Sequence, residues 1–152
     1  MNRSGMFLCQ EGMTLIELLI TVLIIGILAG VAVPSYTSHL RQTRRADAKT
    51  GLMQAAQFLE RNYSANNCYN KTSPADCSGQ SGSDVTLPLT QAPAPPSTAT
   101  YTLSATTLAR NSYVLQATPT GVQTGDACGN FTLASSGVQG VSGLTVAECW
   151  QR

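Results

Sequence analysis

Charged side chains are scarce in this sequence, and their scarcity narrows the class of protein. Only 11% of the 152 residues are Asp, Glu, Lys or Arg, and the formal net charge is +1. A balance so close to neutral argues against a surface that attracts nucleic acid in general. Histidine occurs once, at His39, and no two of the five cysteines have C-x-x-C spacing. These absences disfavour a metal centre, a redox pair and a general base, so we expect no catalytic residue, no metal and no cofactor.

The hydrophobic residues are concentrated in one block near the start of the chain. No Asp, Glu, Lys or Arg occurs from Leu18 to Leu40, and about 20 such residues suffice for a helix to cross a bilayer. Glu17 stands at the head of this block. An acidic side chain deep in hydrocarbon costs on the order of 3 kcal/mol, and such a residue usually has a function and a nearby partner. As the cation that pairs with Glu17 we expect the amino group of a chain terminus. We therefore predict one membrane-spanning helix and an external head of roughly 100 residues.

Two signals disagree about the side of the membrane on which the head lies. Four basic residues follow the apolar block, and positive-inside counting alone would place them in the cytoplasm: Arg41, Arg44, Arg45 and Lys49. The head also holds an even set of cysteines, which is typical of an oxidising compartment: Cys68, Cys77, Cys128 and Cys149. We give the cysteines more weight and expect the head to lie outside the cytoplasm. We expect the basic residues to form salt bridges with Asp47 or with neighbouring subunits.

Helical periodicity continues beyond the apolar block. Apolar residues recur at spacings near 3.6: Leu40, Ala48, Leu52, Ala55, Ala56 and Leu59. This pattern predicts one helix from about Thr14 to Tyr63, whose second half is amphipathic and forms the spine of the head.

Two glycines and a proline interrupt the membrane-spanning part of that helix. Gly26 and Gly30 are four residues apart, so they share one face and permit close approach by a neighbouring helix. Pro34 lacks a backbone donor and clashes with the preceding turn. We therefore predict a kink or local unwinding near residues 30 to 34.

The second half of the chain predicts a small sheet. Period-two alternation predicts half-buried antiparallel strands over residues 101–106, 113–118 and 130–133. A fourth strand near Val85 to Leu89 is restricted to an edge by Pro88. Five of the seven prolines lie between Pro74 and Pro96, which predicts an ordered surface loop. The fold class is therefore α+β, with a long N-terminal helix packed on an antiparallel sheet of three to four strands.

The segment Gly12-Met13-Thr14-Leu15-Ile16-Glu17, followed by the apolar run to Val33, resembles the class III signal of type IV pilins. The resemblance implies that a prepilin peptidase cuts after Gly12 and that Met13 is then methylated. It also implies that Glu17 neutralises the Met13 amine, its own or that of an adjoining subunit. A secretory signal peptide fits less well, because its cleavage site follows the hydrophobic region. Met13 stands where most pilins have Phe.

Later segments extend the resemblance, most closely to PilE-type minor pilins. Residues 52–69 resemble the helix end of that group, and residues 126–133 with 148–150 resemble its cysteine-bounded D-region. Four cysteines allow three pairings. We favour Cys68 with Cys77 and Cys128 with Cys149, because each pair joins near neighbours in sequence.

The implied organisation has three parts. Residues 1–12 form a leader, residues 13–37 a hydrophobic assembly helix, and residues 38–152 the head. Within the head the expected segments are a helix, a loop, a sheet and the D-region: residues 38–63, 64–98, 99–135 and 128–149.

We expect a minor subunit of a type IV pilus that serves twitching motility, adhesion or DNA uptake. It would lie in the inner membrane before assembly and in the extracellular pilus afterwards, with Gly26, Gly30 and Pro34 in the assembly helix. The expected partners are other pilins, the prepilin peptidase and methylase, the assembly machinery and membrane lipid. DNA is a conceivable partner that the few basic residues of the head do not support. A major pilin, a type II secretion pseudopilin and a DNA- or ligand-binding competence pilin remain open, as does an anchored binding module that never polymerises. An anchored enzyme is the weakest alternative.

Overall fold

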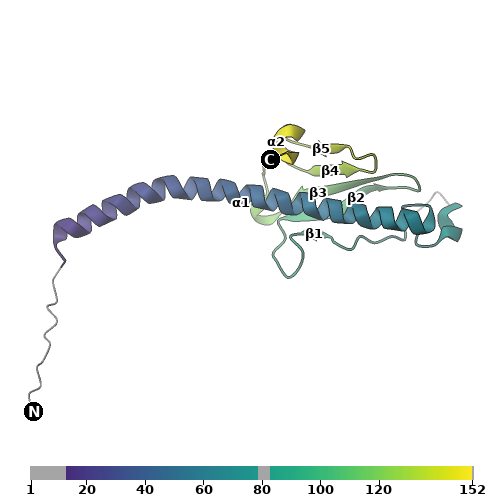
Figure 1. The fold of residues 1–152 in the computed structure, drawn as a ribbon, viewed down its shortest axis with the longest axis horizontal. Coiled ribbons are helices and arrows are strands. Elements are labelled where there is room, and N and C mark those ends of the chain that lie inside the picture. Colours follow the sequence, from purple (N-terminus) through teal and green to yellow (C-terminus); the bar gives the residue numbers. More distant parts are fainter. Residues whose placement is uncertain (1–12, 79–82, 152) are drawn as a thin grey trace, which may run out of the picture. The chain divides into compact units, whose positions relative to one another are not determined.

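A computed structural model describes residues 13–78 and 83–151 (Figure 1). Gly12 and the rest of the expected leader lie outside the described residues. The chain divides into two compact units, with the boundary between Ser38 and His39. The helix α1 (Leu15–Asn66) begins in the first unit and ends in the second.

The first unit consists of the apolar part of α1. An 18-residue window in this helix has a mean hydropathy of 2.7, so by length and composition it can cross a membrane. The helix runs without interruption through Pro34. We predicted a kink or local unwinding near residues 30 to 34. The unwinding is wrong for this structure, because Pro34 removes one backbone donor while the helix continues on both sides of it. The Thr37 hydroxyl donates to the carbonyl of Pro34 at 2.9 Å and adds a local contact.

The second unit combines the rest of α1 with one antiparallel sheet, whose strand order is β1-β2-β3-β4-β5. The strands are β1 (Gln91–Ala92), β2 (Tyr101–Leu108), β3 (Tyr113–Pro119), β4 (Phe131–Ala134) and β5 (Gln139–Val141). Three short helices complete the unit: η1 (Pro74–Ser78), η2 (Gly121–Gln123) and α2 (Val146–Trp150).

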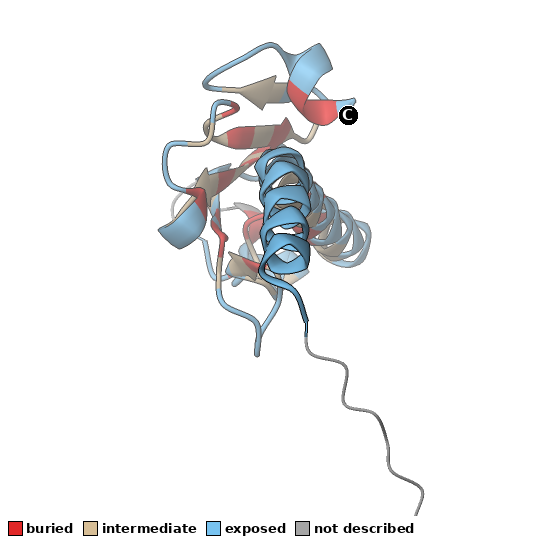
Figure 2. Ribbon diagram, turned by 90° about the vertical axis from the view of Figure 1, so that its left-hand side faces the viewer, coloured by how far each residue is buried: buried red, intermediate tan, exposed pale blue. Residues whose placement is uncertain are grey.

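The core lies between α1 and one face of the sheet. Alternate side chains of the strands are buried, among them Tyr101, Leu115 and Phe131, each 0% exposed. They meet the face of α1 that carries Leu52 and Leu59, which are also fully buried. Figure 2 shows the same division, with the start of α1 exposed and buried residues in the strands. The amphipathic pattern of the sequence thus reports which face of the helix is covered.

At Gly51 the helix lies close to the sheet. A Cβ at this position would lie 2.8 Å from Cδ1 of Leu103 and 3.6 Å from Cβ of Ala92. A glycine costs about 1 kcal/mol within a helix, and here that cost is offset because its small size lets α1 lie close to β1 and β2.

The predicted α+β class and the three predicted central strands are confirmed. The edge strand predicted near Val85 to Leu89 is wrong in position, because β1 forms at Gln91–Ala92, where Thr90 accepts a hydrogen bond from the Leu103 amide at 2.8 Å. The fifth strand, β5, was missed, since three residues are too few to show alternation. The helix also ends at Asn66 rather than at Tyr63, and Asn67 follows it with a φ of 60°.

Adjacent positions of α1 provide a test of this packing. Leu52 is 0% exposed and Met53 is 47% exposed. Leu52→Ala should lower the free energy of unfolding by about 2–5 kcal/mol, because it leaves a cavity against the sheet. Met53→Ala should cost less than about 1 kcal/mol. Urea unfolding of the full chain in detergent, followed by Trp150 fluorescence, measures both values, and equal losses would contradict the burial of this face.

Candidate functional site

The apolar side chains of the assembly segment are exposed in the part of the chain that the structure describes. The large ones between Met13 and Val33 are 50% to 80% exposed. A Cβ at Gly26 or at Gly30 would meet nothing within 4 Å. No described residue therefore requires their small size for packing, whereas that size suits contact with another helix.

Glu17 lies in the first turn of α1 and is exposed. Its backbone N–H donates to the hydroxyl of Thr14 at 3.3 Å, so Thr14 caps the start of the helix. Met13 is also exposed, four residues before Glu17.

A network of charged and polar groups ties α1 to the chain segment after β3. The guanidinium of Arg45 donates from Nε to both carboxylate oxygens of Asp126, at 3.1 and 2.9 Å, and also from a terminal nitrogen. The hydroxyl of Tyr101 donates to the same carboxylate at 2.9 Å. We expected this basic cluster to pair with Asp47 or with neighbouring subunits. Asp47 is wrong for Arg45, whose partner Asp126 is 81 residues away in sequence. Sequence proximity gave no sign of that contact.

The network shifts the ionisation of its members. Burial alone would raise the pKa of Asp126, but hydrogen bonds from Arg45 and Tyr101 outweigh it, and the pKa lies below its ordinary value. The hydrogen bond with Asp126 outweighs burial and raises the pKa of Arg45. Burial, together with the Asp126 carboxylate, raises the pKa of the Tyr101 hydroxyl. All three pKa shifts correspond to an Asp126 that is ionised at neutral pH.

Lys49 fastens the end of the chain to the same helix. This buried side chain donates to the carbonyls of Cys149 and Trp150, at 3.2 Å each. Burial lowers the pKa of Lys49, and the charge of Arg45 adds to that effect. The C-terminal segment is also held by the Cys128–Cys149 disulfide and by a hydrogen bond from the Trp150 indole to Gly140, at 3.0 Å.

Three parts of the head converge at the far end of α1. The Cys68–Cys77 disulfide closes the loop that follows the helix. Within that loop the Tyr69 amide donates to the carbonyl of Arg110, in the turn between β2 and β3, at 2.9 Å. This contact places Arg110 beside the loop that carries Lys71, whose ammonium lies 3.2 Å from the carboxylate of Asp84. Both disulfides are therefore the pairs favoured from the sequence.

Glu60 organises the aromatic residues at this end. Its carboxylate accepts hydrogen bonds from the hydroxyls of Tyr69, at 3.1 Å, and Tyr113, at 3.0 Å. The rings of Tyr69 and Tyr113 meet edge to face at 4.9 Å, and Tyr63 packs on Tyr69 at 4.6 Å. Burial raises the pKa of both hydroxyls that bind Glu60, and the bond to Glu60 adds to the effect.

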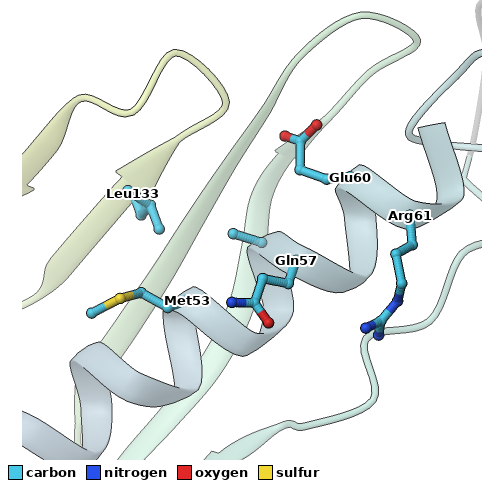
Figure 3. Close-up of a pocket in the computed structure, with 6 residues that line it drawn as sticks. Met53, Gln57, Glu60, Arg61 and Leu133 are labelled. Carbon is cyan, nitrogen blue, oxygen red and sulfur yellow. The ribbon is translucent and has the colours of Figure 1, made fainter. Parts of the chain in front are cut away.

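A shallow groove of about 490 Å³ runs along α1 beside this cluster (Figure 3). Met53, Ala56, Gln57, Glu60 and Arg61 line it from the helix, and Leu133 lines it from β4. Figure 3 shows Glu60 and Arg61 pointing away from each other. Because Glu60 is already engaged by two tyrosines, the groove presents mainly apolar surface.

Metal ligands were not expected from the sequence. Within residues 13–78 and 83–151 no three His, Cys, Asp or Glu side chains gather where they could hold an ion. His39 lies on α1 and is exposed. The residues that the sequence analysis missed are Tyr101, Asp126 and Glu60 in their linking roles, since nothing in local spacing pairs a helix residue with a distant strand or loop.

The Arg45–Asp126 pair predicts a specific dependence of stability on pH. Because the pKa of Asp126 is depressed in the folded state, its contribution is present above the ordinary carboxyl pKa of about 3.9 and is lost as pH falls through the lower folded value. Asp126→Asn should cost about 2–4 kcal/mol at neutral pH, since Arg45 loses its charged partner. The difference in the free energy of unfolding between the variant and the native chain should shrink in acid. Urea unfolding at several pH values tests this, with Asp76→Asn as the exposed control; a gap that stays constant would contradict it.

Comparisons with known proteins agree with these features. The family described as type IV minor pilin ComP, DNA uptake sequence receptor, matches residues 34–132, and the prokaryotic N-terminal methylation motif matches residues 8–33. The chain is 40% identical over 78 residues to the type IV major fimbrial protein FimA of Dichelobacter nodosus. That match covers 49% of this chain and 49% of FimA, so the chain spans about half the length of this relative.

Two solved pilin structures are also similar. A type IV pilin from Shewanella oneidensis is 30% identical, with 74% of this chain and 99% of that chain covered and a TM-score of 0.47. The minor pilin PilV of Neisseria meningitidis is 22% identical, with 71% and 92% covered and the same TM-score.

The ComP family match covers more than half of the chain, and the methylation motif spans the junction between Gly12 and Met13. The resemblance to type IV pilins is thereby confirmed. The motif and the apolar helix are those of a pilin that is anchored in the inner membrane and assembles into an extracellular pilus. The chain belongs to the type IV minor pilin ComP family and is a type IV pilus subunit.

Proposed function

We propose that this chain is cleaved after Gly12, methylated at Met13 and built into the pilus as a minor subunit. The observation that carries this proposal is the pair of matches, one to the methylation motif over residues 8–33 and one to the minor pilin family over residues 34–132. The role is structural and associative rather than catalytic. A major subunit is the second candidate, because FimA is a major fimbrial protein, and abundance in sheared pili separates the two.

Assembly requires the apolar helix to leave lipid and pack against other pilins. The exposed apolar side chains before Val33 supply the contact surface, and Gly26 and Gly30 permit close approach. Pro34 offers no N–H to the carbonyl of Gly30, so this part of the helix has one backbone hydrogen bond fewer.

Glu17 guides this step through its charge. A carboxylate that enters an apolar filament core carries a large desolvation cost, which an amine of opposite charge offsets. The new amino terminus at Met13, on the same or a neighbouring subunit, is that amine. Glu17 is exposed at the start of α1, which suits a contact with another subunit.

Replacing Glu17 tests the pairing. Glu17→Val should leave cleavage and methylation largely intact and reduce incorporation into pili more than about tenfold, because the Met13 amine then lacks a partner. Glu17→Asp keeps the charge and should retain more incorporation. Mass spectrometry of membranes and of sheared fibres reports cleavage, methylation and incorporation together. Wild-type amounts of Glu17→Val in fibres would refute the pairing role.

We further propose that the head binds DNA at the far end of α1, in support of DNA uptake. The family that matches residues 34–132 is described as a DNA uptake sequence receptor. At this end Arg110 lies exposed in the β2–β3 turn, beside the Cys68–Cys77 loop with Lys71. Because Asp84 offsets the charge of Lys71, Arg110 is the stronger phosphate ligand. Few phosphates are then contacted, so affinity relies on polar contacts as well.

The salt dependence of binding tests this surface. Arg110→Gln should weaken binding of duplex DNA to the processed full chain by about 5- to 10-fold and reduce the slope of log affinity against log salt by about 1. Arg41→Gln, which makes the same charge change at the other end of the head helix, serves as the control and should have little effect. Fluorescence anisotropy over a salt series measures both quantities. An unchanged slope for Arg110→Gln would exclude this end as the DNA site.

A further inference from the structure

The basic residues that follow the membrane-spanning segment fall into two groups. Arg45 and Lys49 are committed within the head, to Asp126 and to the C-terminal carbonyls. Arg41 is exposed. Arg44 is partly buried and lies 3.5 Å from the side-chain oxygen of Gln123. The guanidinium groups of Arg41 and Arg44 therefore lie at the start of the head, and neither forms an ion pair with a carboxylate of the described residues in the way that Arg45 does.

The loop around η2 (Gly121–Gln123) lies beside these arginines. Arg41 and residues 122–126 line a small hollow of about 50 Å³. The loop is anchored from beneath, because Gln123 is 2% exposed and Asp126 is bound by Arg45. Val122, in contrast, is 72% exposed. An ordered loop thus holds an apolar side chain outward next to two cations.

Position along the chain indicates what this surface meets. The uncharged run from Leu18 to Leu40 is 23 residues long, or about 34 Å as a helix, close to the thickness of a bilayer core of about 30 Å. Arg41 is the next residue. In the membrane-anchored subunit its guanidinium therefore lies at the level of the lipid headgroups.

We propose that Arg41, Arg44 and the exposed Val122 form a docking surface for anionic phospholipid on the outer face of the inner membrane, used by the subunit before assembly. Guanidinium groups bind phosphate in a bidentate manner. An apolar side chain beside cations is the arrangement of interfacial membrane contacts. The one carboxylate that lines the hollow, Asp126, is neutralised by Arg45, so it does not repel the lipid phosphate.

DNA phosphate offers the same ligand chemistry, but two features favour lipid. The surface directly follows the membrane-spanning run, and Val122 gains nothing from a phosphate backbone in water, whereas it is buried in a lipid interface. Docking restrains the head of the anchored subunit against the membrane surface. Extraction into the pilus then requires that these contacts be released.

Tryptophan quenching by brominated lipid tests the docking surface in the full chain. Val122→Trp is placed in vesicles of brominated phosphatidylcholine with or without phosphatidylglycerol, and the signal of native Trp150 is measured in parallel. We expect strong quenching with phosphatidylglycerol and little without it. Each basic residue at an anionic surface strengthens binding about fivefold, so Arg41→Gln with Arg44→Gln should lower the ratio of docked to undocked heads roughly 20-fold. Raised salt should also weaken docking.

Arg110→Gln is the matched control, because it removes one exposed arginine elsewhere on the head and should leave quenching unchanged. Equal quenching with and without phosphatidylglycerol, or no loss in the double arginine variant, would overturn the proposal. If the double variant instead loses affinity for duplex DNA and keeps its lipid quenching, the arginines belong to a DNA surface and the lipid proposal falls. Failure of the DNA proposal at Arg110 would leave these outcomes unaffected, so the two ideas are tested separately.

Discussion

The organisation of this protein depends on one constraint: the first half of α1 carries large apolar side chains that stay exposed among the described residues. Apolar surface contributes about 25 cal/mol per Å² when it leaves water, so such a segment needs lipid or other helices around it at every stage. The membrane supplies this environment before assembly and neighbouring pilins supply it afterwards. Glu17 lies exposed in the first turn of the same helix, and in the proposed assembly its charge would give the transfer from lipid to filament a preferred register.

The second half of α1, in contrast, is covered by the sheet on one face and must stay attached to it. Three polar contacts at intervals along the helix secure that attachment, in addition to the buried face around Leu52. Arg45 binds Asp126, Lys49 binds the C-terminal carbonyls, and Glu60 binds two tyrosines. Each joins α1 to at least one residue 53 or more positions away in sequence. Since their partners are buried or hydrogen-bonded, these side chains specify one position of the helix on the sheet.

The sequence predicted what depends on local pattern and missed what depends on distant partners. The apolar run, the helical face that carries Leu52 and the three central strands follow from periodicity, and the structure has them. Strand β5 is too short to show alternation, and β1 is set by pairing with β2 rather than by its own composition. The basic cluster was expected to pair with Asp47 or with neighbouring subunits, whereas burial of Tyr101 and Asp126 against the helix pairs Arg45 with Asp126. Polar contacts between residues that are distant in sequence produce no periodic pattern in the sequence.

The two ends of the head helix can therefore serve different partners without competition. From Arg41 to Arg61 the helix rises about 30 Å, so a phosphate bound near the η2 loop and one bound near the β2–β3 turn do not share a site. The membrane-proximal end carries Arg41, Arg44 and Val122, next to the uncharged run. The far end carries Arg110 and the Cys68–Cys77 loop, which chain continuity places beyond the whole amphipathic helix. A subunit held at the membrane by its first end would still present its second end to ligands outside.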